Sequence, residues 1–453
     1  MKTRTNTSKY KWSFLLLLAL LIPSTSMLGQ TDVQPVVIKQ SAKVKANPKV
    51  DVLVYDVPTD ILPATGNEIK VELEYYADGK EEDLKKLRNS IEENLLTYYQ
   101  GDNSVDITLN LHNYFELEIM GMRWSRVTTK GSGKKETIKL KEFKIKSYKI
   151  WLPADMSLNL DAKYSRVNVN TNINGPVNLK IYDSQLSTQS IAGDVEGEMK
   201  YSSLKAHSLG NIYLELYETK LKAEESLKGT IDAKYSDISI RNMQALKFDG
   251  YEGNLYLSHV PMLDITTKYT NLSIVSAHQL NLSAYEGTSK LGKIDDLVIQ
   301  GKYLELKGEE LKSLKMTDGY ENEITFDKIE SLISTGGKYN EFSIGEVTKQ
   351  LIIDGYEEEV DIDKMQGNFE KIELSGKYLE SDITIYNPQA HTLSGSVQYP
   401  DLNVNEKAYT IRKKVGDSSK LEFEFEFGDV SQSKSKITIN GYECDVNLQH
   451  ITN

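Results

Sequence analysis

Tyrosine recurs along the central two-thirds of the chain at nearly even spacing, with gaps of 16 to 22 residues between successive tyrosines. Internal repetition of this kind is typical of a solenoid, in which each unit contacts only its neighbours. The repeat constrains the fold more strongly than any other feature, although it leaves open what the surface binds. The repeated residues are Tyr164, Tyr182, Tyr201, Tyr217, Tyr235, Tyr251, Tyr269, Tyr285, Tyr303, Tyr320, Tyr339, Tyr356 and Tyr378.

The residues beside these tyrosines alternate along the chain. A lysine precedes one set, as in Lys163-Tyr164, and an acidic residue follows the other set, as in Tyr182-Asp183. Between the tyrosines, apolar side chains alternate with polar ones, so that each unit holds two short strands with a period of two. We therefore predict an all-β fold, a β-solenoid whose tyrosines form an offset-stacked ladder at one corner, about 4.8 Å apart.

The length of one turn is open, because the tyrosines recur about every 17 residues but each flanking pattern only about every 34. A 34-residue turn would stack like charges in one column, whereas a 17-residue turn alternates cations and anions along one edge. Opposite charges on adjacent strands are favourable by roughly 0.2 to 1 kcal/mol per pair. The sequence favours the shorter turn, which gives thirteen turns over roughly 60 Å.

The first 29 residues are predicted to be a secretory signal peptide, because basic residues precede the apolar run Phe14 to Ile22 and small polar residues follow it. The run is too short for a stable membrane span, and no second such run follows. The single cysteine, Cys444, lies far from the signal, so we expect no lipid anchor and no intrachain disulfide. We expect an exported protein of the periplasm or cell surface that is not a lipoprotein and has no transmembrane segment once mature.

The chain after the signal divides into three regions, because solenoids expose sheet edges at their ends and need caps. Apolar residues at helical spacing from Leu84 to Leu95 predict one amphipathic helix near residues 81–98. The alternating run Leu421 to Phe427 predicts an amphipathic strand near the other end. The predicted regions are an N-terminal strand-rich capping region at 30–153, solenoid repeats at 154–390, and a C-terminal cap with a last repeat-like turn at 391–453.

Composition and spacing argue against several functions. A formal net charge of -12 disfavours nucleic acid as a partner, since phosphate binding needs a concentrated basic face. Every repeat carries much the same charges, so no turn stands out as a catalytic site, and no cofactor is expected. The corners also lack the Gly-rich nonapeptides, with Asp at fixed positions, that calcium-binding rolls use. The six histidines lack metal-ligand spacing. They are His112, His207, His259, His278, His391 and His450.

The repeats resemble those of a family of exported β-helical adhesin-like proteins, domain of unknown function 4097, and of related head-domain adhesins. The resemblance rests on Ile150-Trp151-Leu152-Pro153 and on Lys-Tyr repeats such as Lys234-Tyr235-Ser236 and Lys268-Tyr269-Thr270, a version similar to Bacteroidetes-like members. It covers about residues 148–450. It implies a single-stranded right-handed β-helix at the cell envelope and supplies no catalytic residues.

The sequence thus predicts an exported, non-enzymatic, adhesin-like scaffold that binds an unknown protein or glycan at the cell envelope. The exposed tyrosines could stack on sugar rings, but their recurrence in every turn favours a structural role. Two alternatives stay open. A carbohydrate-active enzyme would gather carboxylates with unusual pKa values in one cleft, and a structural or assembly subunit of the envelope would polymerise through a weakly capped end.

Overall fold

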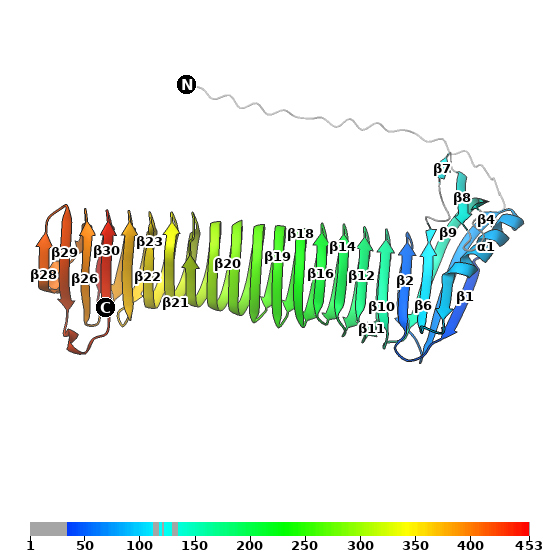
Figure 1. Cartoon of the computed structure of the whole chain (residues 1–453), viewed down its shortest axis with the longest axis horizontal. Helices are drawn as coiled ribbons and strands as arrows, with labels where there is room; N and C mark the ends of the chain where they lie inside the picture. Colours follow the sequence, from blue (N-terminus) through cyan, green and yellow to red (C-terminus); the bar gives the residue numbers. More distant parts are fainter. Residues whose placement is uncertain (1–33, 112–116, 120–121, 129–134, 453) are drawn as a thin grey trace, which may run out of the picture. The chain divides into compact units, whose positions relative to one another are not determined.

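The computed structural model describes residues 34–111, 117–119, 122–128 and 135–452. The predicted signal peptide and His112 lie outside these residues. The described part is mostly β-strand with one α-helix, and its parallel strands stack into a β-solenoid that follows an N-terminal strand region (Figure 1). This confirms the predicted fold class, with about thirteen turns between Tyr164 and Tyr378.

The elements fall into three groups along the chain. The first group is β1 Val36–Lys43, β2 Lys49–Tyr55, β3 Thr59–Pro63, β4 Glu68–Gly79, α1 Glu81–Leu95, β5 Leu96–Tyr99, β6 Ser104–Asn110, β7 Leu117–Ile119, β8 Met122–Thr128 and β9 Lys135–Leu152. The repeats are β10 Ser157–Lys163, β11 Arg166–Ile173, β12 Val177–Tyr182, β13 Gln185–Ile191, β14 Val195–Lys200, β15 Ser203–Leu209, β16 Ile212–Tyr217, β17 Lys220–Ser226, β18 Lys228–Asn242, β19 Ala245–His259, β20 Met262–Thr317, β21 Glu323–Lys338, β22 Glu341–Tyr356, β23 Glu359–Gln366, β24 Lys371–Lys377 and β25 Glu380–Tyr386. The last group is β26 His391–Gln398, β27 Asp401–Val404, β28 Thr410–Gly416, β29 Lys420–Phe427, β30 Lys436–Tyr442 and β31 Asp445–Ile451.

Each turn holds about 17 residues, as the register of the parallel strands shows. Val195 of β14 pairs with Ile212 of β16, and Ala245 of β19 pairs with Met262 of β20. Within a strand such as β12, alternate side chains point inward and are buried. They join one continuous apolar core that no single turn could form alone.

The alternation of cations and anions expected for the short turn runs between two neighbouring columns and not within one. Lys163 pairs with Tyr182, and Tyr182 pairs with Lys200, so a tyrosine separates successive lysines in this column. The acidic residues stand in the neighbouring column, one position later in the sequence. Cations and anions therefore do not alternate directly within one column, although like charges are kept two turns apart.

One corner of each turn is closed by a residue in the left-handed backbone region, as at Tyr164 with φ of 50° and Asp183 with φ of 44°. Such a conformation costs on the order of 1 to 3 kcal/mol in a non-glycine residue. Hydrogen bonds between turns offset this cost. The Ser184 hydroxyl donates to the Tyr182 carbonyl at 2.8 Å and accepts from the backbone N–H of Ser165 at 2.9 Å. The serines and threonines that follow the corner thus satisfy backbone groups inside the bend.

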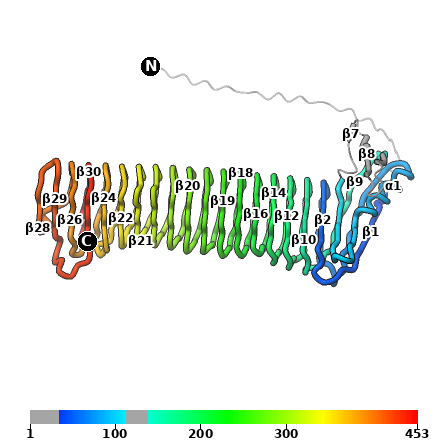
Figure 2. Tube along the Cα trace, viewed as in Figure 1, coloured from blue at the N-terminus to red at the C-terminus, as the bar shows by residue number. Residues whose placement is uncertain are grey.

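At the N-terminal end, an early segment of the chain lies between two later ones (Figure 2). Strand β2 pairs with β6 on one side and β10 on the other, and β3 lies likewise between β9 and β11. Helix α1 buries Leu87, Ile91 and Leu95 and contacts β4, β6 and β9. The predicted helix is present, but it ends at Leu95 because the chain there enters β5, which pairs antiparallel with β6.

The C-terminal end is interlaced in the same way. Strand β30 pairs with β24 and β26, and β31 pairs with β25 and β27, so the last segment of the chain lies inside the stack (Figures 1 and 2). Strand β29 pairs antiparallel with β26 and β28, and its Phe423 and Phe425 are buried. Among the described residues, no helix is long and apolar enough to cross a membrane.

Candidate binding surface along the tyrosine strip

All thirteen repeated tyrosines lie in one unbroken row, with the ring centroids of successive turns 5.4 to 5.9 Å apart. The row continues to Tyr55 at one end and to Tyr442 and Tyr399 at the other. We call these sixteen tyrosines, with the charged residues beside them at the corner, the tyrosine strip. The predicted ladder did not include these three tyrosines, although Tyr442 falls in the predicted last repeat-like turn, and Tyr55-Asp56 and Tyr442-Glu443 carry the same acidic neighbour as the repeats.

The rings meet edge to face, with interplanar angles of 65° to 89°, and not in the predicted offset stack. The cause lies in the alternating sequence. Tyr182 occupies the position before the corner, whereas Tyr164 and Tyr201 occupy the left-handed corner itself. Successive rings leave the backbone in different directions, so the positive edge of one ring contacts the negative face of the next.

The strip carries two columns of charge. Before the corner, lysine alternates with tyrosine, and at the corner, tyrosine alternates with aspartate or glutamate. The lysines are Lys163, Lys200, Lys234, Lys268, Lys302, Lys338 and Lys377, and the acids are Asp56, Asp183, Glu218, Glu252, Glu286, Glu321, Glu357 and Glu443. Within the described chain, no ion pair joins a strip lysine to a strip acid. Lys200 pairs with Glu198, and Lys268 lies over the rings of Tyr269 and Tyr285 at 5.0 and 5.1 Å.

The strip is accessible to a partner. Tyr182 is 37% exposed and Tyr201 is 44% exposed. Partial burial, followed by neighbouring charges, raises the pKa of Tyr235, Tyr303 and Tyr339 above the ordinary value. These hydroxyls therefore stay protonated at neutral pH and remain hydrogen-bond donors.

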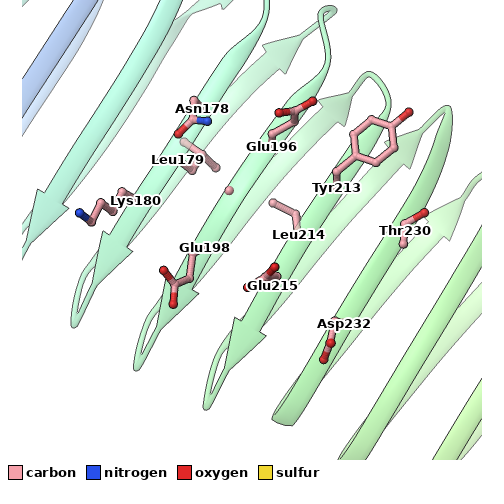
Figure 3. A pocket seen from close by; sticks show the side chains of 11 residues that line it. Asn178, Leu179, Lys180, Glu196, Glu198, Tyr213, Leu214, Glu215, Thr230 and Asp232 are labelled. Carbon is pink, nitrogen blue, oxygen red and sulfur yellow. The ribbon is translucent and has the colours of Figure 1, made fainter.

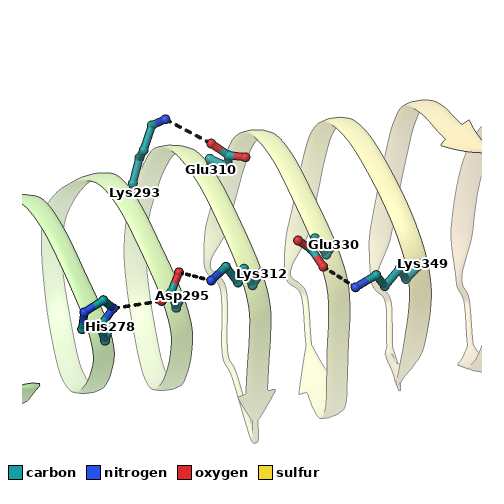
Figure 4. Close-up of polar contacts among 7 residues, drawn as sticks. All are labelled: His278, Lys293, Asp295, Glu310, Lys312, Glu330 and Lys349. Atoms are coloured by element: carbon teal, nitrogen blue, oxygen red, sulfur yellow. Dashed lines mark hydrogen bonds and ion pairs between the residues drawn. The ribbon is translucent and has the colours of Figure 1, made fainter. Parts of the chain in front are cut away.

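A second column of charge, away from the strip, is paired turn by turn (Figure 4). The Asp295 carboxylate accepts from His278 Nδ1 at 2.9 Å and from Lys312 Nζ at 2.8 Å, and these contacts lower its pKa, with Lys312 contributing most. Glu330 pairs with Lys349 two turns further along. Here the charges of the chain neutralise one another directly, which the strip charges do not do.

A buried polar ladder lies just inside the strip. The Asn322 side-chain amide donates to Asn340 Oδ1 at 2.7 Å, and the Asn340 amide donates to Glu358 Oε1 at 2.9 Å. Glu358 is 1% exposed, and its Oε2 has no hydrogen-bond partner in the described chain. Burial raises the pKa of this carboxyl to about 7, against the opposing hydrogen bond from Asn340.

A second buried cluster joins three segments of the C-terminal cap. Nδ1 of His391 donates to the Gln389 carbonyl at 2.8 Å, so in the neutral ring Nε2 accepts from the Tyr409 hydroxyl at 3.2 Å. The Tyr409 oxygen then accepts from Nε2 of His450 at 3.0 Å, which leaves Nδ1 of His450 without a partner in the described residues. Burial lowers the pKa of both histidines, to about 4 for His450. Sequence analysis missed this cluster because insertion of β31 brings together residues far apart in the chain.

A shallow hollow of about 570 Å³ opens on the outer face of β12, β14, β16 and β18 (Figure 3). Gly197 takes the inward position that Leu179 and Leu214 hold in adjacent strands. Glu198, Glu215 and Asp232 follow one another across its rim. In the described part of the chain, no group of three or more histidine, cysteine or acidic side chains could hold a metal ion.

No protein-family model and no curated protein matches the chain. One solved structure matches, described as a "putative cell adhesion protein from Clostridium sporogenes", with 10% sequence identity over 92% of this chain and 99% of the other. Its TM-score is 0.16, so this likeness carries no conclusion about function.

Proposed function

We propose that this chain is an exported, non-enzymatic binding scaffold, adhesin-like in role, that acts in the periplasm or at the cell surface through the tyrosine strip. One observation carries the proposal. Sixteen half-exposed tyrosines, flanked by lysines and acids that form no ion pairs with one another within the described residues, form a single surface from the first turn to the last. The predicted signal peptide and the resemblance to exported β-helical adhesin-like proteins support the location and the family.

The strip suits multivalent contact. Aromatic rings supply contact area at low entropic cost, and the flanking lysines and carboxylates supply polar contacts. Repetition every turn lets many weak contacts act together. Interlaced caps close both ends of the stack, which favours a discrete scaffold over an open fibre.

The test is a thermal-shift and binding screen of the chain without residues 1–29 against glycans, peptidoglycan fragments and calcium, with every hit assayed for turnover. A saturable shift that is lost in a Tyr235→Ala, Tyr251→Ala, Tyr269→Ala variant would support the strip as the binding surface. The matched control replaces Tyr213 and Tyr256, which are exposed but lie away from the strip. Product formation that depends on Glu215 would instead establish an enzyme.

A further inference from the structure

The charges of the tyrosine strip form a pattern that is complementary to itself. A turn of the first type presents a lysine and a tyrosine, as in Lys268-Tyr269, and a turn of the second type presents a tyrosine and an acid, as in Tyr285-Glu286. The two positions of the tyrosine alternate through all sixteen turns, from Tyr55 to Tyr399, but in the Tyr399 turn Gln398 stands where the other turns of the first type have lysine. The strip as a whole holds seven lysines and eight carboxylates, so it is nearly neutral.

We infer that the strip binds a second copy of this chain, side by side and antiparallel. The inference rests on the proposed function, because it names the partner of the same surface. Suppose that the second copy is related to the first by a two-fold axis that crosses the strip at right angles to its length. The column before the corner in one copy then faces the same column in the other copy, and the two corner columns also face each other. Each turn of the first type then lies opposite a turn of the second type.

This arrangement places opposite charges and rings in contact. Lys268-Tyr269 lies opposite Tyr285-Glu286 of the second copy, so the ammonium group of Lys268 faces the ring of Tyr285 and lies one column away from the carboxylate of Glu286. A parallel pair at equal height would instead place turns of the same type together, with like charges at one level. A parallel pair shifted by one turn would match charges but would leave an open, non-closing assembly. Only the antiparallel pair both matches the charges and closes.

The strip has sixteen turns, an even number, so two antiparallel strips can overlap along their whole length and still place each turn opposite a turn of the other type. When turn one faces turn sixteen, every lysine-bearing turn meets a turn that carries an acid, and only the terminal pair, the Tyr55 turn opposite the Tyr399 turn, lacks a lysine because residue 398 is glutamine. The contact would be roughly 70 Å long and roughly 10 Å wide, or roughly 1,400 Å² in total, which lies in the range of specific interfaces. The strip lysines and acids, which unlike the charges of the Asp295 column form no ion pairs with one another in the described part of the chain, would meet opposite charges in this interface.

The experiment is sedimentation equilibrium of the chain without residues 1–29 at low and high salt. We expect a dimer that weakens as salt rises, because exposed charges are screened. The reversal Lys234→Glu, Lys268→Glu, Lys302→Glu should weaken dimerisation by about tenfold or more. The matched control Lys205→Glu, Lys222→Glu, Lys247→Glu changes the net charge equally on exposed positions away from the strip and should leave the dissociation constant within about twofold.

A charge swap guards against misfolding as the explanation. In the antiparallel pair, the turns of the three reversed lysines lie opposite the turns of Glu321, Glu286 and Glu252 of the second copy, respectively, with each glutamate in the column next to its lysine. Adding Glu321→Lys, Glu286→Lys and Glu252→Lys should therefore restore the dimer. A monomer at all concentrations, equal weakening by both reversals, or failure of the swap in a folded protein would overturn the inference. If the chain is monomeric but binds a ligand in the screen above, the inference fails and the proposed function stands.

Discussion

Replacing Glu358 by glutamine is expected to stabilise the solenoid at alkaline pH and to leave it unchanged at acid pH. The carboxyl ends the Asn322–Asn340 ladder, is almost fully buried, and has a pKa raised to about 7 by burial. Glutamine has the same shape and continues the ladder as a neutral amide. It also removes the cost of ionising a buried group.

The sign and size follow from proton linkage. The folded state holds the proton of Glu358 up to about pH 7, whereas the unfolded chain releases it near 4.5, the ordinary value. The stability due to Glu358 is therefore complete below pH 4.5 and is lost as pH rises to 7. A difference of about 2.5 pKa units at 1.36 kcal/mol each corresponds to about 3 kcal/mol at pH 8.

Hydrogen exchange of peptides from β21, β22 and β23 provides the assay, because a long repeat array need not unfold in one step. The matched control is Glu357→Gln, which removes the same charge from the exposed strip one residue away and should change protection by less than about 0.5 kcal/mol. A Glu358→Gln variant that gains no protection at pH 8, or gains as much at pH 4.5, would refute the reasoning.

Three further perturbations have defined outcomes. The C-terminal cap should lose about 2 kcal/mol of stability as pH falls from 6.5 to about 4, because burial lowers the pKa of His450 and protonation then favours the unfolded state. The loss is kept to this size because solvent partly screens the ring. Hydrogen exchange in β31 would measure the loss, and unchanged protection would count against it. Ser202→Ala removes a buried hydroxyl that bonds backbone groups at the corner and should cost about 1 to 3 kcal/mol in calorimetry. The neighbouring Ser203→Ala should be nearly neutral, and equal effects of the two changes would contradict the structural role of the corner hydroxyls. Gly197→Ala should cost about 1 to 3 kcal/mol, because the new methyl group would overlap the adjacent strand and the backbone φ of 150° is unfavourable for alanine. At Gly101 an added methyl group meets no neighbour, so Gly101→Ala should leave the melting temperature unchanged.

The solenoid could be predicted from the sequence because each turn repeats the same local pattern. The spacing of the tyrosines indicated the number of residues in each turn, and the alternation of apolar and polar residues indicated which side chains point inward. The edge-to-face ring geometry followed from the same alternation, since a tyrosine before the corner and a tyrosine at the corner cannot point in the same direction. The prediction of offset stacking treated all tyrosines as equivalent, although Tyr182-Asp183 and Lys200-Tyr201 differ by one position.

The ends of the stack could not be predicted in the same way, because they depend on contacts between distant segments. Tyr442 follows Tyr378 in space but lies 64 residues later in the sequence. The alternation of Lys-Tyr turns with Tyr-acid turns nevertheless indicates the neighbour. After Lys377-Tyr378, the next turn must carry a tyrosine followed by an acid, as Tyr442-Glu443 does. The pairing of His391 with His450 through Tyr409 had no such local signal.

The central claim is that the tyrosine strip is a contact surface for a second copy in antiparallel register, and zero-length carbodiimide cross-linking tests it most directly. Lys234 and Glu321 lie five turns apart in one chain, roughly 24 Å and beyond the reach of such a link, but in directly opposite turns and neighbouring columns of the antiparallel pair. The account predicts a Lys234–Glu321 cross-link in the dimer fraction that disappears on dilution. Cross-links of Lys234 confined to neighbouring turns of its own chain would contradict it.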